Sequence, residues 1–284
     1  MSNSDKYKEV IQANIELHSK LSKHYNTCEP HFRPENINHV EQYIKKIAAE
    51  TSAKRLADFG CGTGFIINIA KKYVDHITGV DVTQDMLDRV YKSGSATIEL
   101  INHDTGSVVL QPESYDVVTA YSFLHHLFDI TTTLQNANKC LRKGGMFYAD
   151  LEPNYYFWEG VNLLNRNSNY DPIVKREIEA VTYKDEDIEN TFGVKKEVFN
   201  NAEFGKNIAG GFKEGELTDK LLSCGFSEVK FFYHWYIGQG AIINDDKFPK
   251  EERFANAAII DDLLRKALPL SKNLYKYVGF IAKK

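Results

Sequence analysis

The sequence predicts an α/β fold: a mostly parallel sheet of seven strands with an antiparallel last strand, an N-terminal helical lid and an inserted cap. Two observations carry this prediction. Residues Leu56 to Asp81 form a pattern of strand, glycine turn, helix and second strand, which is the first unit of a doubly wound nucleotide-binding sheet. Further short apolar runs then alternate with helical segments along the chain, as expected when helices cover both faces of a sheet.

The glycine turn defines the kind of ligand. Asp58 ends the first strand, and Gly60, Gly62 and Gly64 follow at every second position, while Asp81 ends the second strand. Glycine lets the backbone turn tightly and approach a ligand closely. An acid at the strand tip can accept hydrogen bonds from a ribose diol, each worth roughly 1.5–3 kcal/mol. A carboxylate beside the turn repels a pyrophosphate and suits a ligand with positive charge.

The residues DFGCGTG followed by VDVT resemble the first two motifs of the class I S-adenosylmethionine-dependent methyltransferases. The resemblance implies a Rossmann-like fold and S-adenosyl-L-methionine as cofactor, which carries an ammonium and a sulfonium and no phosphate. Dinucleotide enzymes instead use the spacing G-x-G-x-x-G. The alternative, in which the glycines serve only as a turn, is disfavoured by the strand-turn-helix-strand context.

Two amphipathic helices are expected before this unit. Residues 6 to 24 place six side chains on one helical face, and residues 37 to 50 carry Val40, Ile44 and Ile47 inward. In similar methyltransferases such helices form a lid over the cofactor cleft, here residues 1 to 50. The resemblance also places Tyr25 near the sulfonium, where an aromatic ring suits a cation. The alternative is that Tyr25 only packs at a helix end. The six residues on the first face are Tyr7, Val10, Ile11, Ile15, His18 and Leu21.

A second helix is expected over residues 83 to 94, and a third strand over residues 97 to 102. The resemblance implies that Val82 and Met86 pack on the adenine, and that Asp104 accepts a hydrogen bond from the adenine amino group. The alternative for Asp104 is a turn aspartate before Gly106. The full set expected at the cofactor is Tyr25, Asp58, Gly60, Cys61, Gly62, Gly64, Asp81, Val82, Met86, Asp104, Thr105 and Tyr121.

The segment SFLHHLFD follows the fourth strand, Tyr115 to Tyr121, and bears on the chemistry. The N/D-P-P-Y/F turn of enzymes that methylate amino groups of bases or amides is absent here, as are a cysteine nucleophile and the metal-binding aspartate of catechol-type enzymes. The pattern L-H-H-L resembles the group that acts on small molecules. In that family the second position is most often histidine, which favours His126 over His125 as a general base. The alternative is a structural histidine.

The second half of the chain departs from the minimal fold. A helix over residues 131 to 142 and a fifth strand lead into a long insertion, residues 155 to 211, interpreted as a substrate cap. Within it, residues 177 to 190 predict an acidic, solvated helix. A helix over residues 213 to 224, a sixth strand buried on both sides, a second insertion and the antiparallel last strand follow. Further polar candidates around the site are Tyr121, Glu152, Tyr155 and His234.

Four regions are therefore expected: residues 1 to 50 as the lid, 51 to 154 as the cofactor-binding half, 155 to 211 as the cap, and 212 to 284 as the remainder of the sheet.

Composition and charge disfavour nucleic acid and membranes as partners. The chain has 284 residues, 43% hydrophobic and 26% charged, with a net charge of −4 and no Lys/Arg run longer than a pair. Nucleic acid is disfavoured, because phosphate neutralisation needs a clustered basic face. No apolar run approaches a membrane span, and no signal-peptide core is apparent.

The cysteines lack any metal-binding spacing. Cys28, Cys61, Cys140 and Cys224 are scattered, so reduced thiols in a cytoplasmic protein are expected, with no metal site. Cys61 lies in the glycine turn, where only a small residue fits. The oligomeric state stays open.

The sequence thus predicts a methyltransferase that acts on an oxygen or nitrogen of a small molecule, without a metal, by proximity and a general base. Two alternatives remain. One is a cofactor-binding protein of the same fold with a different reaction, and the other is a nicotinamide dehydrogenase, which the glycine spacing disfavours.

Overall fold

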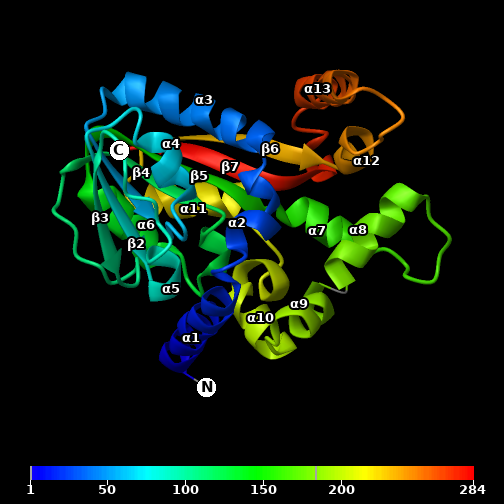
Figure 1. Ribbon diagram of the computed structural model, residues 1–284, viewed down its shortest axis with the longest axis horizontal. Coiled ribbons are helices and arrows are strands. Elements are labelled where there is room, and N and C mark those ends of the chain that lie inside the picture. The colour runs from blue at the N-terminus through cyan, green and yellow to red at the C-terminus, as the bar shows by residue number, and fades with distance from the viewer. Residues whose placement is uncertain (1, 183) are drawn as a thin grey trace.

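The computed structural model describes residues 2–182 and 184–284 and has the predicted architecture, a seven-stranded sheet in the order β3-β2-β1-β4-β5-β7-β6 (Figure 1). β1 to β5 are parallel, and β7 runs antiparallel between β5 and β6. The predicted sheet with its antiparallel last strand is therefore confirmed. The strands are β1 Arg55–Phe59, β2 His76–Asp81, β3 Thr97–Asn102, β4 Tyr115–Tyr121, β5 Leu141–Pro153, β6 Glu228–Tyr236 and β7 Tyr275–Lys283.

Helices cover both faces of the sheet. On one face α3 (Pro34–Thr51) buries Val40, Ile44 and Ile47, as predicted, and α4 (Phe65–Ala70) packs in the same apolar cluster. On the other face α6 (Thr131–Cys140) and α11 (Glu214–Ser223) contribute to a second apolar cluster. β4 lies between the two clusters and is buried along its whole length.

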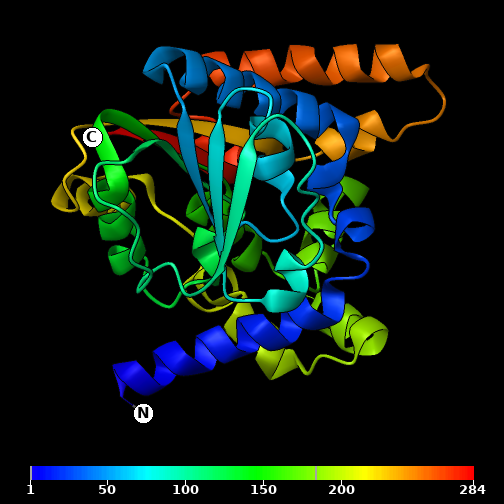
Figure 2. The ribbon, with the colours of Figure 1, turned by 60° about the vertical axis from the view of Figure 1, so that its left-hand side comes forward.

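The carboxyl ends of the strands are covered by α1 (Asn3–Leu21), which crosses beneath them (Figure 2). Beside α1 lies the first insertion, whose helix α10 (Lys196–Ala202) packs on α1 through Leu17, Leu21 and Phe199. The predicted lid and cap segments therefore share one small apolar core. The rest of the insertion is α7 Tyr155–Asn162, α8 Pro172–Thr182, α9 Lys184–Phe192 and the π-helical turn η3 Phe204–Ile208.

The second insertion lies away from these ends and forms α12 (Gln239–Ile243) and α13 (Lys250–Lys266). Among the described residues, no helix is both long and apolar enough to cross a membrane. The short elements that complete the chain are α2 Tyr25–Cys28, α5 Gln84–Leu87, η1 Pro30–Phe32, η2 Leu124–His126 and η4 Lys272–Leu274.

The helix predicted over residues 83 to 94 is wrong beyond its first turn. α5 ends at Leu87, and the following chain is held by tertiary contacts. Val90 is buried, and the Lys71 ammonium donates to the carbonyl oxygen of Ser93 at 2.9 Å. These contacts outweigh the weak helical preference of the segment.

The helix predicted over residues 131 to 142 also ends early. α6 stops at Cys140, because Leu141 already pairs with Tyr115 in the sheet before the register shifts. On α1 the buried face differs slightly from the prediction, since Leu17 and Asn14 are buried and Ile15 is only half-buried.

Two predictions in the second half need correction. The acidic stretch 177 to 190 is not one solvated helix: it spans the end of α8 and most of α9, and Glu177 is buried in an ion pair with Lys276 at 2.6 Å. Tyr183, in this stretch, lies outside the described residues. β6 is an edge strand, and its first residue, Glu228, is exposed, so burial on both sides begins only further along.

Candidate functional site

The glycine turn joins β1 to α4 at the carboxyl end of the sheet. The amides of Gly60 and Cys61 donate to the carbonyl oxygen of Val80, at 2.8 and 3.1 Å, which fixes the turn to the end of β2. Gly60 has φ +66°, and a Cβ built there would lie 1.9 Å from the ring of Phe123. Only glycine is therefore compatible with this close approach between the turn and the segment after β4.

Asp81 links the turn to the start of α5. Its carboxylate accepts the Gly62 amide at 2.9 Å and the Thr83 amide at 2.8 Å. Burial raises the pKa of Asp81, and these hydrogen bonds partly oppose that rise. A carboxylate has about four acceptor positions, so this one can still accept hydrogen bonds from a diol.

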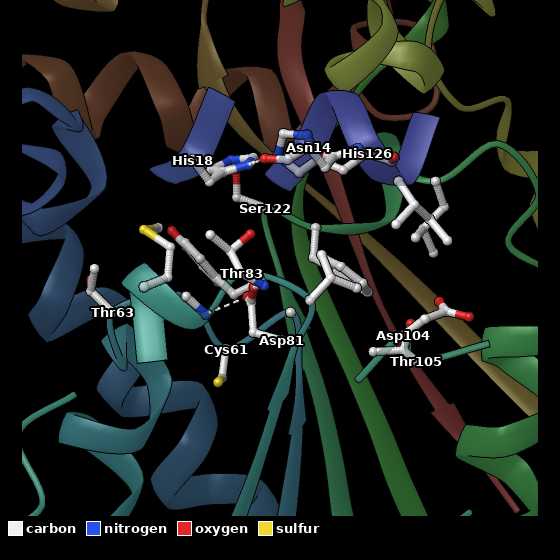
Figure 3. A pocket seen from close by; sticks show the side chains of 18 of the residues that line it. Asn14, His18, Cys61, Thr63, Asp81, Thr83, Asp104, Thr105, Ser122 and His126 are labelled. Atoms are coloured by element: carbon white, nitrogen blue, oxygen red, sulfur yellow. Dashed lines mark hydrogen bonds between the residues drawn. The ribbon is translucent and has the colours of Figure 1, made fainter. Parts of the chain in front are cut away.

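A cavity with about 850 Å³ of empty space, including space open to solvent, lies between this turn and α1 (Figure 3). Ten of the twelve residues predicted at the cofactor line it, and Asp58 and Gly64 do not. Those that line it are Tyr25, Gly60, Cys61, Gly62, Asp81, Val82, Met86, Asp104, Thr105 and Tyr121.

Asp58 lies buried at the end of β1 and has an unsatisfied oxygen. Oδ1 accepts the Thr119 hydroxyl at 2.7 Å, whereas Oδ2 has no hydrogen-bond partner among the described residues. Burial raises the pKa of Asp58 to about 7. A positively charged ligand near the turn would favour the ionised carboxylate, even though Asp58 does not line the cavity.

Asp104 has a structural role in addition to its predicted one. It accepts the Tyr7 hydroxyl, the Ser107 hydroxyl at 2.8 Å and, through its other oxygen, the Gly106 amide at 3.0 Å. The turn interaction given above as the alternative is therefore present. Contact between Asp104 and an adenine amino group stays a prediction.

α1 supplies residues that sequence reasoning did not assign to the cofactor. Asn14 is buried and donates through Nδ2 to the carbonyl oxygens of Val10 and His126, both at 2.9 Å. His18 lies one turn further along and meets the His126 ring edge-to-face at 4.9 Å. The only sequence signal for these residues was a polar side chain on an apolar helical face. The cavity residues outside the predicted set are Tyr7, Val10, Ile11, Asn14, His18, His31, Thr63, Phe65, Thr83, Ser122, Phe123, Leu127, Phe128 and His126, the last predicted as a base.

A second cavity, with about 740 Å³ of empty space, opens beside the first, toward the cap. Apolar and aromatic side chains such as Leu17, Phe199 and Trp235 line it, together with His125 and Glu203. The residues that border both cavities are His18, Tyr25, His31, Ser122 and His126. The two spaces are therefore neighbours, and His126 stands at their junction.

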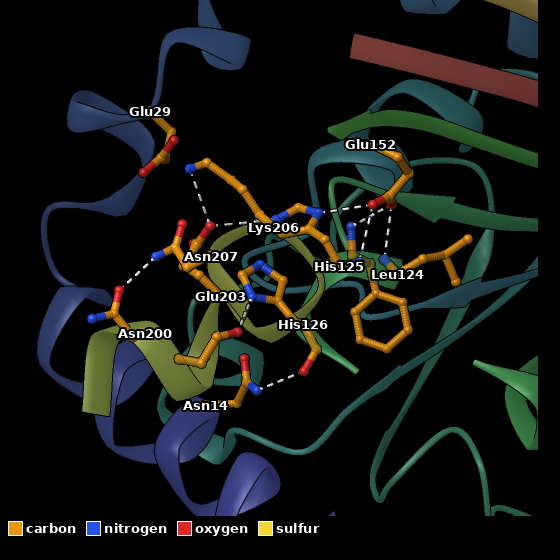
Figure 4. Close-up of polar contacts among 12 residues, drawn as sticks. Asn14, Glu29, Leu124, His125, His126, Glu152, Asn200, Glu203, Lys206 and Asn207 are labelled. Carbon is orange, nitrogen blue, oxygen red and sulfur yellow. Dashed lines mark hydrogen bonds and ion pairs between the residues drawn. The ribbon is translucent and has the colours of Figure 1, made fainter. Parts of the chain in front are cut away.

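The histidine pair is held in η2 by hydrogen bonds on one ring nitrogen each (Figure 4). His125 Nδ1 lies 2.8 Å from Glu152 Oε2, and His126 Nδ1 lies 2.7 Å from the carbonyl oxygen of Ala202. Both histidines are buried. His126 thus lines both cavities, whereas His125 borders only the second, and the general-base role of His126 stays a prediction.

The electrostatics around His126 favour its neutral ring. Burial, together with the neighbouring His125, lowers the pKa of His126 well below its ordinary value, although Glu203 acts in the opposite direction. Burial acts to raise the pKa of Glu203, but Lys206 and the two histidines outweigh it and hold that pKa well below normal.

The remaining polar candidates differ in position. Glu152 is fully buried and accepts the backbone amides of Phe123, Leu124 and His125, so it anchors η2. Tyr155 and His234 border neither cavity. Tyr121 lines the first cavity, and its hydroxyl accepts a hydrogen bond from Asn36 at 2.9 Å.

Comparison with known families agrees with this geometry. Residues 57–149, which contain the glycine turn, Asp81, Asp104 and the histidine pair, match a family described as "Methyltransferase domain". Residues 57–149 therefore form a methyltransferase domain, as the resemblance to the class I S-adenosylmethionine-dependent methyltransferases implied. The cofactor of this family is S-adenosyl-L-methionine, as the sequence predicted.

The relatives of this methyltransferase are distant. The chain is 28% identical over 152 residues to the ubiquinone biosynthesis O-methyltransferase of Bordetella pertussis, covering 51% of this chain and 63% of the relative. It is 27% identical over 153 residues to the enzyme of the same name from Nitrosomonas europaea, covering 49% and 63%. The match thus spans less than two thirds of the relatives' length.

Solved structures share the fold. An S-adenosylmethionine-dependent methyltransferase from Archaeoglobus fulgidus has a TM-score of 0.51 at 15% identity, covering 87% of this chain and 94% of its own. One from Mesorhizobium loti has a TM-score of 0.51 at 14% identity, covering 86% and 96%.

The residues of this methyltransferase fit the cofactor of the family. Asp58 offers a buried oxygen without a partner among the described residues, which suits the ligand's positive charge. Asp81 keeps free acceptor positions beside the glycine turn, which suits a ribose diol.

Proposed function

We propose that this protein transfers a methyl group from S-adenosyl-L-methionine to an oxygen of a small molecule, with nitrogen as the alternative acceptor atom. One observation carries the proposal: the cavity at the glycine turn adjoins a second cavity, and His126 borders both. The names of the curated relatives, which contain "O-methyltransferase", support oxygen.

The second cavity is the proposed acceptor site. Its wall combines α1, the cap helix α10 and the last strands, so that Leu17, Phe199 and Trp235 offer apolar surface. The same wall also carries charged side chains, including Lys184, Glu203 and Lys206, so it suits a small molecule that has polar groups as well as an apolar body. The polar histidine end would receive the reacting group.

The cofactor supplies a methyl group on a sulfonium, which is already an excellent leaving group. The protein then contributes mainly proximity and alignment, an effect worth several kcal/mol and up to roughly 7–11 kcal/mol when the geometry is ideal. α1 helps to enclose this geometry, because Asn14 binds the backbone of His126 directly.

The acceptor hydroxyl must also lose its proton. A base works best when its pKa lies near the working pH, but burial keeps the pKa of His126 well below its ordinary value. His126 alone is therefore a weak base toward a hydroxyl. We assign activation of the acceptor to the histidine pair as a unit.

The test is transfer of label from methyl-labelled S-adenosyl-L-methionine. The protein is incubated with a small-molecule extract, and labelled products are separated and examined by NMR. We expect a new methyl group on oxygen, absent with Asp81→Ala. A methyl group on nitrogen would select the alternative, and label found only on protein or nucleic acid would contradict the proposal.

A further inference from the structure

We propose that His125, His126 and Glu203 form a binding site for one divalent transition-metal cation in the wall of the second cavity. One ligand atom from each of the three residues lies within 4.8 Å of the others. The role of the cation in catalysis rests on the proposed function, whereas binding of the cation does not. Figure 4 shows the three side chains converging from η2 and from the junction of α10 and η3.

The ring nitrogens are arranged as in metal-binding histidines. Glu152 Oε2 and the carbonyl oxygen of Ala202 can only accept hydrogen bonds, so Nδ1 carries the proton in both rings. A ring that is protonated on Nδ1 alone has its lone pair on Nε2. Metal-binding histidines almost always donate their other ring N–H to a carboxylate or a backbone carbonyl, and both versions of that arrangement occur here.

The carboxylate comes from a segment that packs directly on the histidine turn. Gly205 allows this packing, since a Cβ there would lie 2.7 Å from the Cα of His125. Glu203 immediately precedes η3 and places Oε2 3.8 Å from His125 Nε2. π-Helical turns of this kind occur often at functional sites.

The chemistry of the donors selects the cation. Two imidazoles and one carboxylate suit Zn²⁺, Mn²⁺, Fe²⁺ or Co²⁺, whereas Mg²⁺ and Ca²⁺ prefer oxygen ligands. In a tetrahedral Zn²⁺ site the ligand atoms lie about 3.4 Å apart. The ligand atoms here lie up to 4.8 Å apart, so they would have to approach one another by up to about 1.4 Å around a bound Zn²⁺.

Lys206 already places a positive charge beside the candidate metal ligands. Its ammonium lies 3.3 Å from Glu203 Oε2 and 5.5 Å from the centre of the Trp158 ring. The cluster thus already holds one positive charge beside the histidines. A metal would displace this ammonium from Glu203, so Lys206 competes with the metal.

A three-residue site leaves a position open for a further ligand. His125, His126 and Glu203 all line the second cavity, so the open position would take the acceptor hydroxyl, whose pKa a divalent cation lowers as a Lewis acid. The hydroxyl proton leaves to water, and the oxygen forms its bond to the methyl carbon. The C–S bond breaks with its electron pair going to sulfur, and the cation is unchanged.

Metal binding is measured on the full chain without a polyhistidine tag, after chelation and dialysis. Co²⁺ is titrated by absorption and Zn²⁺ by calorimetry, with bound metal counted by mass spectrometry. We expect one ion per chain, with affinity at least about 100-fold lower in His125→Ala, His126→Ala and Glu203→Gln. His76→Ala, at an exposed histidine at the start of β2, is the control and should bind as the wild type does.

The variant Lys206→Met should raise the affinity for the metal rather than lower it. Removing the competing ammonium should tighten Zn²⁺ binding, a result that an unfolded or distorted variant would not give. The proposal is overturned if the wild type binds no ion, or if Glu203→Gln and Lys206→Met both bind as the wild type does.

Binding of S-adenosylhomocysteine is measured in the same metal-free samples. If the protein binds S-adenosylhomocysteine but no metal, the proposed function stands and the cation site is ruled out. Metal binding without affinity for S-adenosylhomocysteine would leave the cation site in place and contradict the proposed function.

Discussion

His126 stands where two cavities meet, and its surroundings restrict its chemistry. Nδ1 is held by the carbonyl oxygen of Ala202, and its backbone oxygen is held by Asn14. Only Nε2 is available, and burial keeps the pKa of the ring well below its ordinary value. A neutral, fixed nitrogen of this kind serves better as a metal ligand than as a general base.

Alanine substitution of each histidine distinguishes a metal ligand from a general base. If the pair holds a cation, His126→Ala and His125→Ala should both lower kcat, by a comparable factor of about 10²–10⁴. Steady-state kinetics with saturating cofactor measures this. A loss confined to His126→Ala would instead indicate a general base, and wild-type kcat in both variants would contradict either role.

Asp58 should make stability depend on pH. Its folded pKa, about 7, lies above the ordinary value of 3.8. The protonated carboxyl therefore favours folding below the lower value, and this contribution is lost as pH rises through the higher one. Asp58→Asn should then stabilise the cofactor-free protein by up to about 4 kcal/mol near pH ~8, and hardly at all near pH ~4.

Denaturant unfolding at the two pH values measures this difference, and Asp75→Asn, at an exposed surface aspartate, is the control. Affinity for S-adenosylhomocysteine should also rise in the wild type as Asp58 ionises near pH ~7, because the ligand carries an ammonium. A pH-independent stability difference between wild type and Asp58→Asn would show that Asp58 is not neutral when buried.

At the scale of elements, the lid and the cap depend on each other. α1 shares an apolar core with α10 through Leu17, Leu21 and Phe199, and Lys6 donates to the Asn201 side chain at 2.8 Å. Tyr7 and Asn14 tie the same helix to Asp104 and His126. Movement of α1 would therefore open both cavities together.

Deletion of residues 1 to 35 should leave a folded sheet with poor activity, because α1 covers the strand ends without joining the sheet. We expect near-native strand content by circular dichroism, but loss of turnover and an at least tenfold weaker affinity for S-adenosylhomocysteine. An unchanged turnover rate would show that α1 is no lid. Asn14→Ala, which removes only the contact to His126 and Val10, should give a smaller loss.

Elements with a local signal could be predicted from the sequence. The glycine turn and Asp81 carry their geometry within a few residues, and apolar periodicity set the buried face of α3. Glu203 and Lys206 had no such signal, because only the folding of the long insertion brings them to the histidine pair. The helix predicted after Asp81 was wrong because burial of Val90 outweighs the helical propensity of that segment. The sequence alone gives no sign of this burial.

At the scale of the whole molecule, both ligand cavities lie at the carboxyl ends of the parallel strands. The order β3-β2-β1-β4-β5-β7-β6 places β1 and β4 side by side at the centre, and the glycine turn and η2 follow directly from these strands. The site is therefore held by the most buried part of the fold, while the lid and the cap close it from outside.

Cofactor binding should raise the free energy of unfolding of the whole protein. A ligand present at 100 times its Kd stabilises the folded state by about 2.7 kcal/mol, which corresponds to a rise in Tm of roughly 4–5 °C for a chain of this size. Thermal unfolding with S-adenosylhomocysteine should show this rise, and NAD should not give it.

Calorimetric titration of S-adenosylhomocysteine into the wild type and into Asp81→Ala tests the central claim most directly. We expect one site per chain in the wild type and an affinity lower by about 10²–10⁴ in the variant, because two charge-assisted bonds to the ribose are lost. Asp75→Ala should bind as the wild type does. No binding to the wild type, or equal affinity in Asp81→Ala, would contradict the assignment of the glycine turn and Asp81 to the methyl donor.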